Sequence, residues 1–344
     1  MKPLHRPPAL KPGSRIGVFT PSWPANVIVR DKYLYGIEVL KRMGFEVVEG
    51  SLTRAETSQG YRSGTPQDRA KEFMELVTDP NVHALIATVG GSNSASLIPY
   101  LDFDKIRAHP KVICGYSDVT SLHMAILAHS GLSTFYGPAV MPSFGEWPDV
   151  LPYTKDSFVS AVQTHRSGPR KLQPPGEWSD HLRFGAGEWK TLERKMKPNN
   201  GWRALNPGEA SGSLIVANLS TLLCSAGTKE FPDLDGRLLL IEQMNAPLNG
   251  DERALRQLER MGVFDAITGL IVSKPEVYDQ QGAPFTFDEL LLEVVGTKRK
   301  YPIITNFDCG HANPMITLAE LTEVRVSAKS GYETEVEILS PMVT

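Results

Sequence analysis

Short apolar runs alternate along the chain with longer stretches in which apolar positions recur every three or four residues. The first pattern is typical of buried strands and the second of amphipathic helices. In the first half, the alternation of strand and helix predicts right-handed crossover units in a parallel sheet. The expected strands cover residues 14–20, 45–49, 82–89, 112–114 and 133–137. The expected helices cover residues 31–43, 65–77, 119–128 and 154–165.

The same alternation returns after residue 210. Expected strands there are 211–216, 237–244, 266–274 and 302–311, and expected helices are 218–225, 251–261 and 287–295. Residues 318–327 and 333–339 alternate apolar and polar positions, which predicts a terminal hairpin. The pattern therefore predicts an α/β protein with a first domain at 1–165, a linker or substrate loop at 166–209 and a second domain at 210–344.

Residues 166–209 have no clear period, and they contain three tryptophans, Trp178, Trp189 and Trp202. The segment is too polar for a core and too aromatic for a free linker. Long loops in compact proteins are often lids or binding loops, and exposed tryptophans could stack on a planar ligand. The alternative is that the tryptophans anchor the loop to the domain surface. Both interpretations stay open at this point.

Composition excludes several classes of protein. The 344 residues are 41% hydrophobic and 22% charged, as in soluble globular proteins of about two domains. A net charge of −3 argues against a nucleic acid polymer as the main partner. No apolar run reaches about 18 residues, and the N-terminus lacks the apolar core of a signal peptide, so we expect no membrane span. Three cysteines without metal-ligand spacing suggest reduced thiols in a cytoplasm and no metal.

Ser117 lies where the strand 112–114 is expected to turn into the helix 119–128. Such a corner exposes a side chain at the end of a sheet and directs backbone N–H groups outward, and an acyl-transfer nucleophile needs both. Serine and aspartate are also favoured helix N-caps, so Ser117 or Asp118 could simply cap this helix. A Gly-x-Ser pattern without a second glycine leaves both interpretations open.

Three further strand ends carry candidate site residues. Gly90 and Gly91 follow the strand 82–89, where they could supply an oxyanion-hole N–H or merely a turn. Glu242 and His311 end two strands of the second half, and ligands bind at strand ends in open α/β proteins. Because a serine hydroxyl needs a base and the base needs an orienting carboxylate, Ser117, Glu242 and His311 are a candidate triad. The alternatives are a salt bridge at the domain seam for Glu242 and a turn histidine for His311.

Four motifs together resemble the LD-carboxypeptidase family of serine peptidases, in order and over nearly the whole chain. They are Gly115-Tyr-Ser-Asp-Val-Thr-Ser-Leu-His123, Gly90-Gly-Ser-Asn-Ser94, Leu240-Ile-Glu242 and Asp308-Cys-Gly-His-Ala-Asn-Pro314. The resemblance implies a flavodoxin-like N-terminal domain with a parallel sheet, beside a smaller C-terminal α/β domain, often in homodimers.

The resemblance also implies roles for individual residues. Ser117 would attack, His311 would act as base and acid, and Glu242 would orient His311. The backbone N–H groups of Gly91 and Asp118 would form the oxyanion hole. Other members of the same loop, Gly90, Asn93 and Ser94, are expected to contact the substrate. No metal or cofactor is expected.

Two branches of the family differ in substrate. Peptidoglycan LD-carboxypeptidases remove the terminal D-alanine from muropeptide tetrapeptides, whereas the microcin C self-immunity branch cleaves the acyl bond between an aspartyl residue and an adenylate-like group. The segment around Trp189 is similar to a loop of the immunity branch, in which aromatic residues stack on the nucleotide base. This resemblance implies a cytoplasmic serine hydrolase that acts on an aminoacyl-nucleotide, with a small muropeptide as the alternative substrate.

A protein of another class could bind peptides or nucleotides in the same cleft without turnover. A nucleotide-binding flavodoxin-like module is disfavoured, because no glycine-rich phosphate loop opens the first helix. The place of residues 166–209 distinguishes the two branches. A position over the Ser117 pocket favours a large planar substrate, and a position packed away from it favours the cell-wall substrate.

Overall fold

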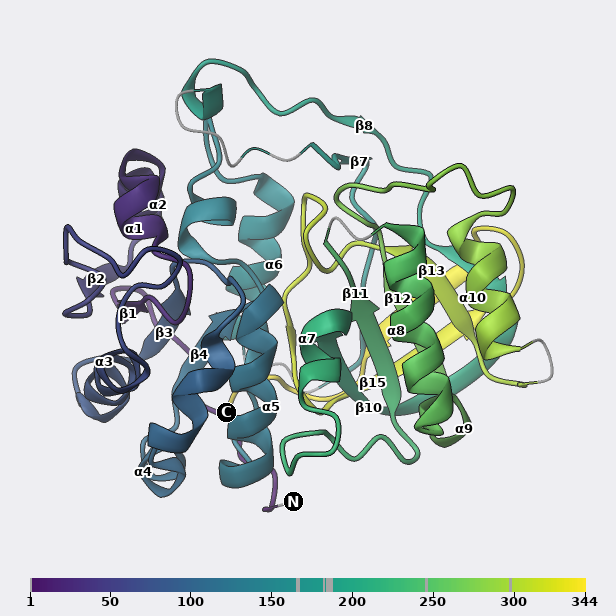
Figure 1. Cartoon of the computed structure of the whole chain (residues 1–344), viewed down its shortest axis with the longest axis horizontal. Helices are drawn as coiled ribbons and strands as arrows, with labels where there is room; N and C mark the ends of the chain where they lie inside the picture. Colours follow the sequence, from purple (N-terminus) through teal and green to yellow (C-terminus); the bar gives the residue numbers. More distant parts are fainter. Residues whose placement is uncertain (1, 165–167, 182, 184–187, 245–246, 297–298) are drawn as a thin grey trace.

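The computed structural model describes residues 2–164, 168–181, 183, 188–244, 247–296 and 299–344. Two β-sheets lie side by side, each covered by helices (Figure 1). This arrangement confirms the predicted α/β fold with a parallel sheet in the first half. Position 165, the last residue of the predicted helix and of the predicted first domain, lies outside the described residues.

The first sheet has the strand order β2-β1-β3-β4-β5-β14. Its first five strands are parallel, and their order 2-1-3-4-5 is that of flavodoxin-like folds. β14 comes from near the end of the chain and pairs antiparallel with β5. The strands are β1 Arg15–Phe19, β2 Glu46–Glu49, β3 Ala84–Ala87, β4 Val112–Gly115, β5 Phe135–Tyr136 and β14 Leu318–Ala319.

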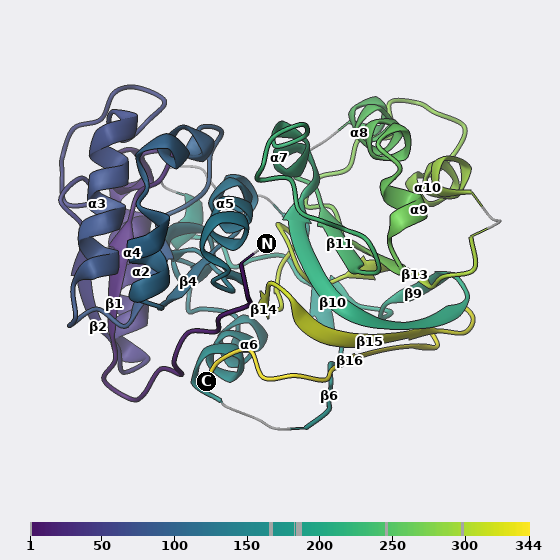
Figure 2. The same cartoon turned by 90° about the horizontal axis from the view of Figure 1, so that it is seen from below.

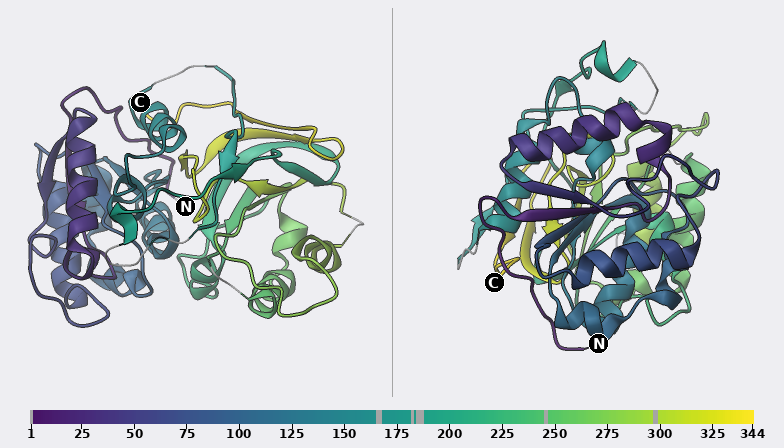
Figure 3. Two further views of the ribbon diagram at one scale, coloured as in Figure 1. Left: turned by 90° about the horizontal axis from the view of Figure 1, so that it is seen from above. Right: turned by 90° about the vertical axis from the view of Figure 1, so that its left-hand side faces the viewer.

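Helices cover both faces of the first sheet, as Figure 3 shows. Side chains of α2 and α6 pack on one face, and side chains of α3, α4 and α5 pack on the other. Strands buried on both faces need the continuous apolar runs seen in the sequence. The helices of this half are α1 Ala25–Ile28, α2 Arg30–Arg42, α3 Pro66–Thr78, α4 Phe103–Ala108, α5 Thr120–Ser130 and α6 Pro152–Gln163.

The second sheet is mixed, with the order β6-β16-β15-β10-β11-β12-β13-β9. The strands β10 to β13 are parallel, and the outer strands are antiparallel to their neighbours. The central strands are β10 Gly208–Asn218, β11 Leu238–Glu242, β12 Gly269–Ser273 and β13 Ile303–Phe307, and the predicted terminal hairpin is β15 Thr322–Ala328 with β16 Thr334–Ile338. The helices are α7 Leu219–Cys224, α8 Leu248–Arg260, α9 Val263–Ala266 and α10 Phe287–Val295.

The two sheets share one hydrophobic core. In β11, Leu239 and Ile241 face the helices α7 to α10, whereas Leu238 and Leu240 face the core that also contains residues of the first sheet. The alternation follows from the two-residue period of a strand. Figure 2 shows α5 next to α7, at the junction of the two halves. The seam between the halves is therefore packed, and the strand ends that meet there are held in fixed positions.

The irregular segment between the halves is not a free linker. Its short strands are β6 Arg170–Lys171, β7 Glu177–Trp178, β8 Lys197–Pro198 and β9 Arg203–Asn206. β6 and β9 form the two edges of the second sheet, while β7 and β8 pair with each other and run across the top of Figure 1. The residues of these four strands are exposed or half-buried, so they form no apolar run from which the pattern could predict a strand. Within the described residues, no helix is both long and apolar enough to cross a membrane.

Candidate active site

Ser117 sits at a sharp corner between β4 and α5, in a 3₁₀ turn of residues Ser117–Val119. Its backbone φ is +65°, in the left-handed region that a non-glycine residue enters only when the surroundings impose it. The corner is also tight: a Cβ added at Gly115 would lie 3.0 Å from both methyl carbons of Val119. A sharp, strained turn between a strand and a helix exposes the side chain of the serine that it carries, as a nucleophile requires.

Neither Ser117 nor Asp118 caps α5. The residue at the N-cap position is Val119, and no side chain makes a capping hydrogen bond there. The Asp118 carboxylate instead accepts hydrogen bonds from the backbone N–H groups of Asn93 and Ser94, both at 2.9 Å, and from the Ser94 hydroxyl at 2.7 Å. Asp118 thus fastens the loop that follows β3 to the Ser117 corner.

That loop requires glycine at its first two positions. A Cβ at Gly90 would lie 3.0 Å from Ser117 Cβ and 3.1 Å from the Asp118 backbone nitrogen. Gly91 has a φ of +148°, and a Cβ there would approach the Ser22 hydroxyl to 2.3 Å. Only glycine lets the backbone come this close to Ser117 at position 90 and to Ser22 at position 91.

Asn93 and Ser94, further along the loop, make contacts within the protein. Ser94 is fully buried against Asp118, and the Asn93 side-chain oxygen accepts a hydrogen bond from Arg69 at 2.6 Å. The structure thus places these two residues where they hold the loop in shape.

A cavity of about 180 Å³ opens above the Ser117 corner. Residues of both halves line it: Trp23, Val89, Gly90, Gly91, Tyr116, Ser117, Met244 and His311. The Tyr116 ring meets the His311 ring edge to face at 4.9 Å between centroids. The structure therefore brings the predicted Ser117 and His311 into one cavity from opposite sides of the seam.

Glu242 lies directly behind His311. His311 Nδ1 is 2.6 Å from Glu242 Oε2, and both side chains are almost fully buried. A Cβ at Gly310 would lie 2.8 Å from the same carboxylate oxygen, so glycine is needed before the histidine. The imidazole is held with its Nδ1 on the carboxylate, which leaves Nε2 as the nitrogen free to exchange a proton.

Two residues that sequence reasoning missed complete the environment of Glu242. The Tyr136 hydroxyl donates to Glu242 Oε1 at 2.5 Å, and it accepts a hydrogen bond from the Ser117 backbone N–H at 3.0 Å. Asn218 Nδ2 donates to the same carboxylate oxygen at 2.9 Å. Tyr136 thus links the Ser117 corner to Glu242. Nothing in the sequence around Tyr136, which lies in a two-residue strand, indicates its contact with Glu242. Asn218 also caps α7, and this is the only role that its sequence position indicates.

Charge and hydrogen bonding set the protonation states of this pair. Burial alone would raise the pKa of Glu242, but the charge and hydrogen bond of His311, with donors from Tyr136 and Asn218, bring that pKa below its ordinary value. Burial would likewise lower the pKa of His311, but Glu242 raises it above the ordinary 6.5. The pair therefore favours a carboxylate beside an imidazolium, which is the state formed when histidine accepts a proton.

Glu276 is a second carboxylate near His311 that sequence reasoning missed. It is 5% exposed, and its Oε2 has no hydrogen-bond partner among the described residues. Burial raises the pKa of Glu276 to about 7, although the positive charges of His311 and Arg194 act against this shift. A buried carboxylate without a partner is costly, which suggests that a ligand group completes it. Among the described residues, no group of three or more His, Cys, Asp or Glu side chains is arranged to hold a metal ion.

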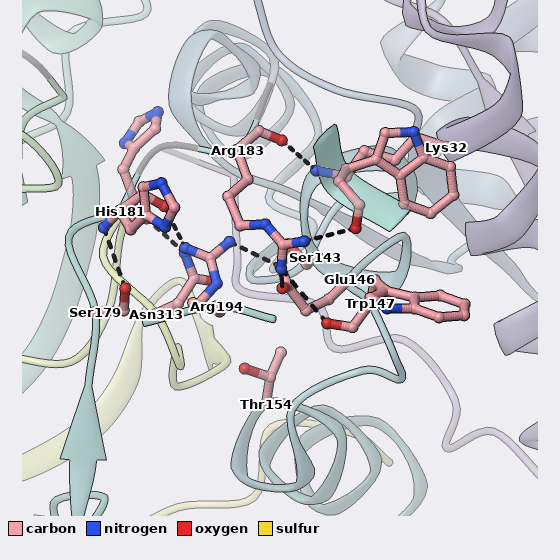
Figure 4. A network of polar contacts seen from close by, with 12 residues as sticks. Lys32, Ser143, Glu146, Trp147, Thr154, Ser179, His181, Arg183, Arg194 and Asn313 are labelled. Atoms are coloured by element: carbon pink, nitrogen blue, oxygen red, sulfur yellow. Dashed lines mark hydrogen bonds and ion pairs between the residues drawn. The ribbon is translucent and has the colours of Figure 1, made fainter. Parts of the chain in front are cut away.

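A buried ion-pair network anchors the segment after β7 to the first half of the molecule (Figure 4). The two oxygens of Glu146 bind the guanidinium groups of Arg183 at 2.6 Å and Arg194 at 2.7 Å. All three side chains are less than a tenth exposed. Lys32 adds a hydrogen bond to the Arg183 carbonyl at 2.6 Å. We call the described residues of this segment, 179–181, 183 and 188–194, the clamp loop.

The clamp loop also contacts the loop after β13, which carries His311. Ser179 and Asn313 exchange two backbone hydrogen bonds, at 2.7 and 2.9 Å, and Asn313 Nδ2 donates to the His311 carbonyl at 3.0 Å. The first half of the molecule is thereby connected through the clamp loop to the backbone that carries His311.

The three tryptophans of the segment lie in different environments. Trp189 is 4% exposed, packs against Tyr35 at 5.5 Å between ring centroids, and is not among the residues lining the Ser117 cavity. Trp202 packs on Phe307 in the core and donates to Asp308 at 2.8 Å. Trp178 lies under the ammonium of Lys197, 3.9 Å from its ring centroid. Trp189 and Trp202 thus anchor the segment, which was one of the two interpretations left open.

Comparison with known proteins identifies relatives over the whole chain. Residues 16–137 match the LD-carboxypeptidase N-terminal domain, and residues 211–326 match the LD-carboxypeptidase C-terminal domain. The chain is 40% identical over 307 residues to the microcin C7 self-immunity protein MccF of Escherichia coli, covering 89% of this chain and 88% of that protein.

One further relative and a solved structure of MccF bear on the choice of substrate. A probable murein peptide carboxypeptidase of Bacillus subtilis is 29% identical over 96% of this chain and 92% of its own length. The solved structure of MccF in complex with aspartyl sulfamoyl adenosine superposes with a TM-score of 0.92, at 35% identity, over 99% of this chain and 100% of that chain.

Proposed function

Because the chain belongs to the LD-carboxypeptidase family of serine peptidases, we propose that it hydrolyses an acyl–amide bond with Ser117, His311 and Glu242 as its catalytic triad. The observation that carries this assignment is the 2.6 Å contact between His311 and Glu242 in a seam whose cavity also exposes Ser117. A serine that shares a cavity with a histidine, together with a carboxylate that holds the histidine from behind, can perform acyl transfer without a cofactor.

The proposed reaction begins when Ser117 Oγ attacks the acyl carbon and His311 Nε2 takes the hydroxyl proton. The carbonyl oxygen then carries the negative charge, which the N–H groups of Gly91 and Asp118 stabilise. Glu242 stabilises the imidazolium, and His311 gives the proton to the leaving nitrogen as the acyl–nitrogen bond breaks. Water activated by the same histidine hydrolyses the acyl–Ser117 ester and restores the free serine.

We propose an aminoacyl-nucleotide as the substrate, of the microcin C type. The level of identity to MccF and the match to its complex with an aminoacyl-nucleotide analogue support this choice. Glu276 supports it as well, because a carboxylate near His311 whose Oε2 has no hydrogen-bond partner among the described residues suits the free ammonium group of an aminoacyl residue. The substrate would thus be a small molecule. We also propose that the enzyme is a homodimer and that it acts in the cytoplasm.

A second candidate is a muropeptide, from which the enzyme would remove a terminal D-alanine. One observation favours it: Trp189 packs against Tyr35 and does not line the Ser117 cavity, so the stacking surface expected for a nucleotide base is not presented there. The relative named as a probable murein peptide carboxypeptidase is consistent with this alternative.

A side-by-side assay tests both candidates. The purified protein is incubated with an aminoacyl-sulfamoyl or aminoacyl-phosphoramidate adenosine and, separately, with a muropeptide tetrapeptide, and the products are identified by mass spectrometry. We expect cleavage of the nucleotide conjugate and at least tenfold slower release of D-alanine. The reverse ratio would assign the enzyme to cell-wall turnover.

The variant Ser117→Ala should keep the fold and lose turnover by several orders of magnitude, because the nucleophile is gone. Ser51→Ala, which changes an exposed serine in the loop after β2, is the matched control and should be unaffected. Full activity of Ser117→Ala would refute the triad, and binding without turnover in the natural protein would support a non-catalytic binding protein instead.

A further inference from the structure

A second, larger cavity lies at the carboxyl ends of β11, β12 and β13. It is on the sheet face that the helices α8 and α10 cover, and Figure 1 shows these helices beside the strands. Its volume is about 310 Å³, within the range of about 300–1,000 Å³ usual for small-molecule pockets. It shares no lining residue with the Ser117 cavity. We call it the α8 cavity. Glu242 lines it, so the two cavities lie on opposite sides of the Glu242–His311 pair.

Apolar side chains form much of the walls of the α8 cavity, beside nine polar or charged lining residues. Its apolar lining residues are Leu219, Ile241, Val272, Pro275, Tyr278 and Phe287. Such walls offer free energy for burying a hydrocarbon or aromatic group, at roughly 25 cal/mol per Å² of apolar surface removed from water. The rings of Tyr278 and Phe287 additionally suit a nearby positive charge.

Among the described residues, Asp251 is the lining carboxylate that has no ion pair. It lies in the first turn of α8, it is 5% exposed, and its Oδ1 has no hydrogen-bond partner among the described residues. By contrast, Asp288 forms an ion pair with Arg203 at 2.6 Å, and Glu242 is paired with His311. Burial raises the pKa of Asp251 to about 7, which shows how poorly its charge is solvated. An orphaned polar group in an apolar pocket calls for a partner of opposite charge.

We propose that the α8 cavity binds a small molecule with a protonated amine on an apolar body, with the ammonium group on Asp251 and the body against Phe287 and Tyr278. A divalent metal ion fits less well, because Ca²⁺ and Mg²⁺ need several oxygen ligands and the cavity offers one uncompensated carboxylate. The ligand is either a separate molecule or an amine-bearing part of the substrate held at Ser117. This proposal goes beyond the reaction proposed above and does not depend on it.

Calorimetric titration of the full-length protein at pH 8 tests the site. The probe is phenethylamine, and 2-phenylethanol serves as a neutral molecule of the same shape. We expect the amine to bind at least tenfold more tightly than the alcohol. Asp251→Asn should weaken amine binding at least tenfold while raising the melting temperature at this pH, because a buried unpaired charge is removed. The higher melting temperature shows that a loss of binding does not reflect unfolding.

Glu252→Gln is the matched control, because it makes the same change on the next residue of α8, whose side chain is 43% exposed and does not line the cavity. It should bind phenethylamine like the natural protein. Equal affinity for amine and alcohol, equal affinity of the natural protein and Asp251→Asn, or no binding at millimolar phenethylamine would overturn the proposal.

A kinetic measurement then identifies the source of the ligand. Competitive inhibition of turnover by phenethylamine assigns the cavity to an amine of the substrate, whereas noncompetitive inhibition or activation assigns it to a separate molecule. The titration is repeated on Ser117→Ala, so that amine binding is measured whether or not the proposed triad is correct.

Discussion

Ser117 has a backbone conformation that few non-glycine residues adopt, and its surroundings impose it. Gly115 and Gly90 allow the corner and the neighbouring loop to pack on it, and Tyr136 holds its backbone N–H. Such strain is stored where it serves function, since it fixes a side chain in a reactive orientation. The same crowding explains why the residues around Ser117 are not interchangeable.

The partner of His311 should control the pH dependence of the reaction. Glu242 raises the pKa of His311 above 6.5, so the neutral base form is lost as pH falls through that raised value, and the acid limb of kcat/KM should lie above 6.5. Glu242→Gln removes the charge. Burial then lowers the His311 pKa, the acid limb moves to lower pH, and kcat falls by roughly 10⁴-fold, as for loss of the triad carboxylate elsewhere.

Glu230→Gln is the control for this experiment, because Glu230 contacts another histidine, His129, at 2.7 Å and lies outside the cavity. It should leave the pH profile of kcat/KM unchanged. An acid limb that stays in place in Glu242→Gln would mean that His311 is not the base whose protonation limits the reaction.

At the scale of elements, the clamp loop connects the first half of the molecule to the loop after β13 that carries His311. Glu146→Gln would leave Arg183 and Arg194 buried without an anion, and breaking a buried pair in this way typically costs about 3–5 kcal/mol. We expect faster tryptic cleavage within residues 179–194 and a lower kcat/KM, because Ser179 pairs with the backbone two residues after His311. Limited proteolysis and thermal melting measure both effects.

The matched control is Asp31→Asn, which breaks an exposed ion pair of the same loop, with Lys190 at 3.4 Å. Exposed pairs contribute about 0–1 kcal/mol, so this variant should melt and resist trypsin like the natural protein. Unchanged cleavage and melting of Glu146→Gln would show that the clamp loop is held by other contacts.

The elements with clear periodicity could be predicted from the sequence, and those without it could not. The expected strand 112–114 and helix 119–128 lie within a few residues of β4 and α5, because β4 is a continuous buried run and α5 is buried along most of its length. The short strands β6 to β9 were not predicted, because pairing with distant strands, rather than local pattern, makes them regular. Element type depends on local spacing, but edge strands depend on tertiary contacts.

The same distinction applies to the site. Ser117, Glu242 and His311 could be proposed because each follows an apolar strand and the motifs around them resemble a known family. Tyr136, Asn218 and Glu276 could not, because their importance comes only from what they contact across the seam. The ion pairs of Glu146 could not be predicted for the same reason, because its partners Arg183 and Arg194 follow 37 and 48 residues later.

At the scale of the whole molecule, the two halves behave as one packed body. The main hydrophobic core contains residues of both sheets, β14 crosses from the second half into the first sheet, and the chain ends pair through Ala9 and Thr344. A nucleophile from one half and a base from the other can therefore be held together without a ligand. The domain limits at 165 and 210 remain a prediction about chain organisation.

The most direct measurement of the central proposal is covalent labelling by a fluorophosphonate, followed by intact-mass and peptide mass spectrometry. We predict one adduct on Ser117 in the natural protein, none on that peptide in Ser117→Ala, and labelling slowed at least a hundredfold in His311→Ala. An adduct on another residue, or labelling of Ser117 at an unchanged rate without His311, would contradict a shared catalytic centre across the seam.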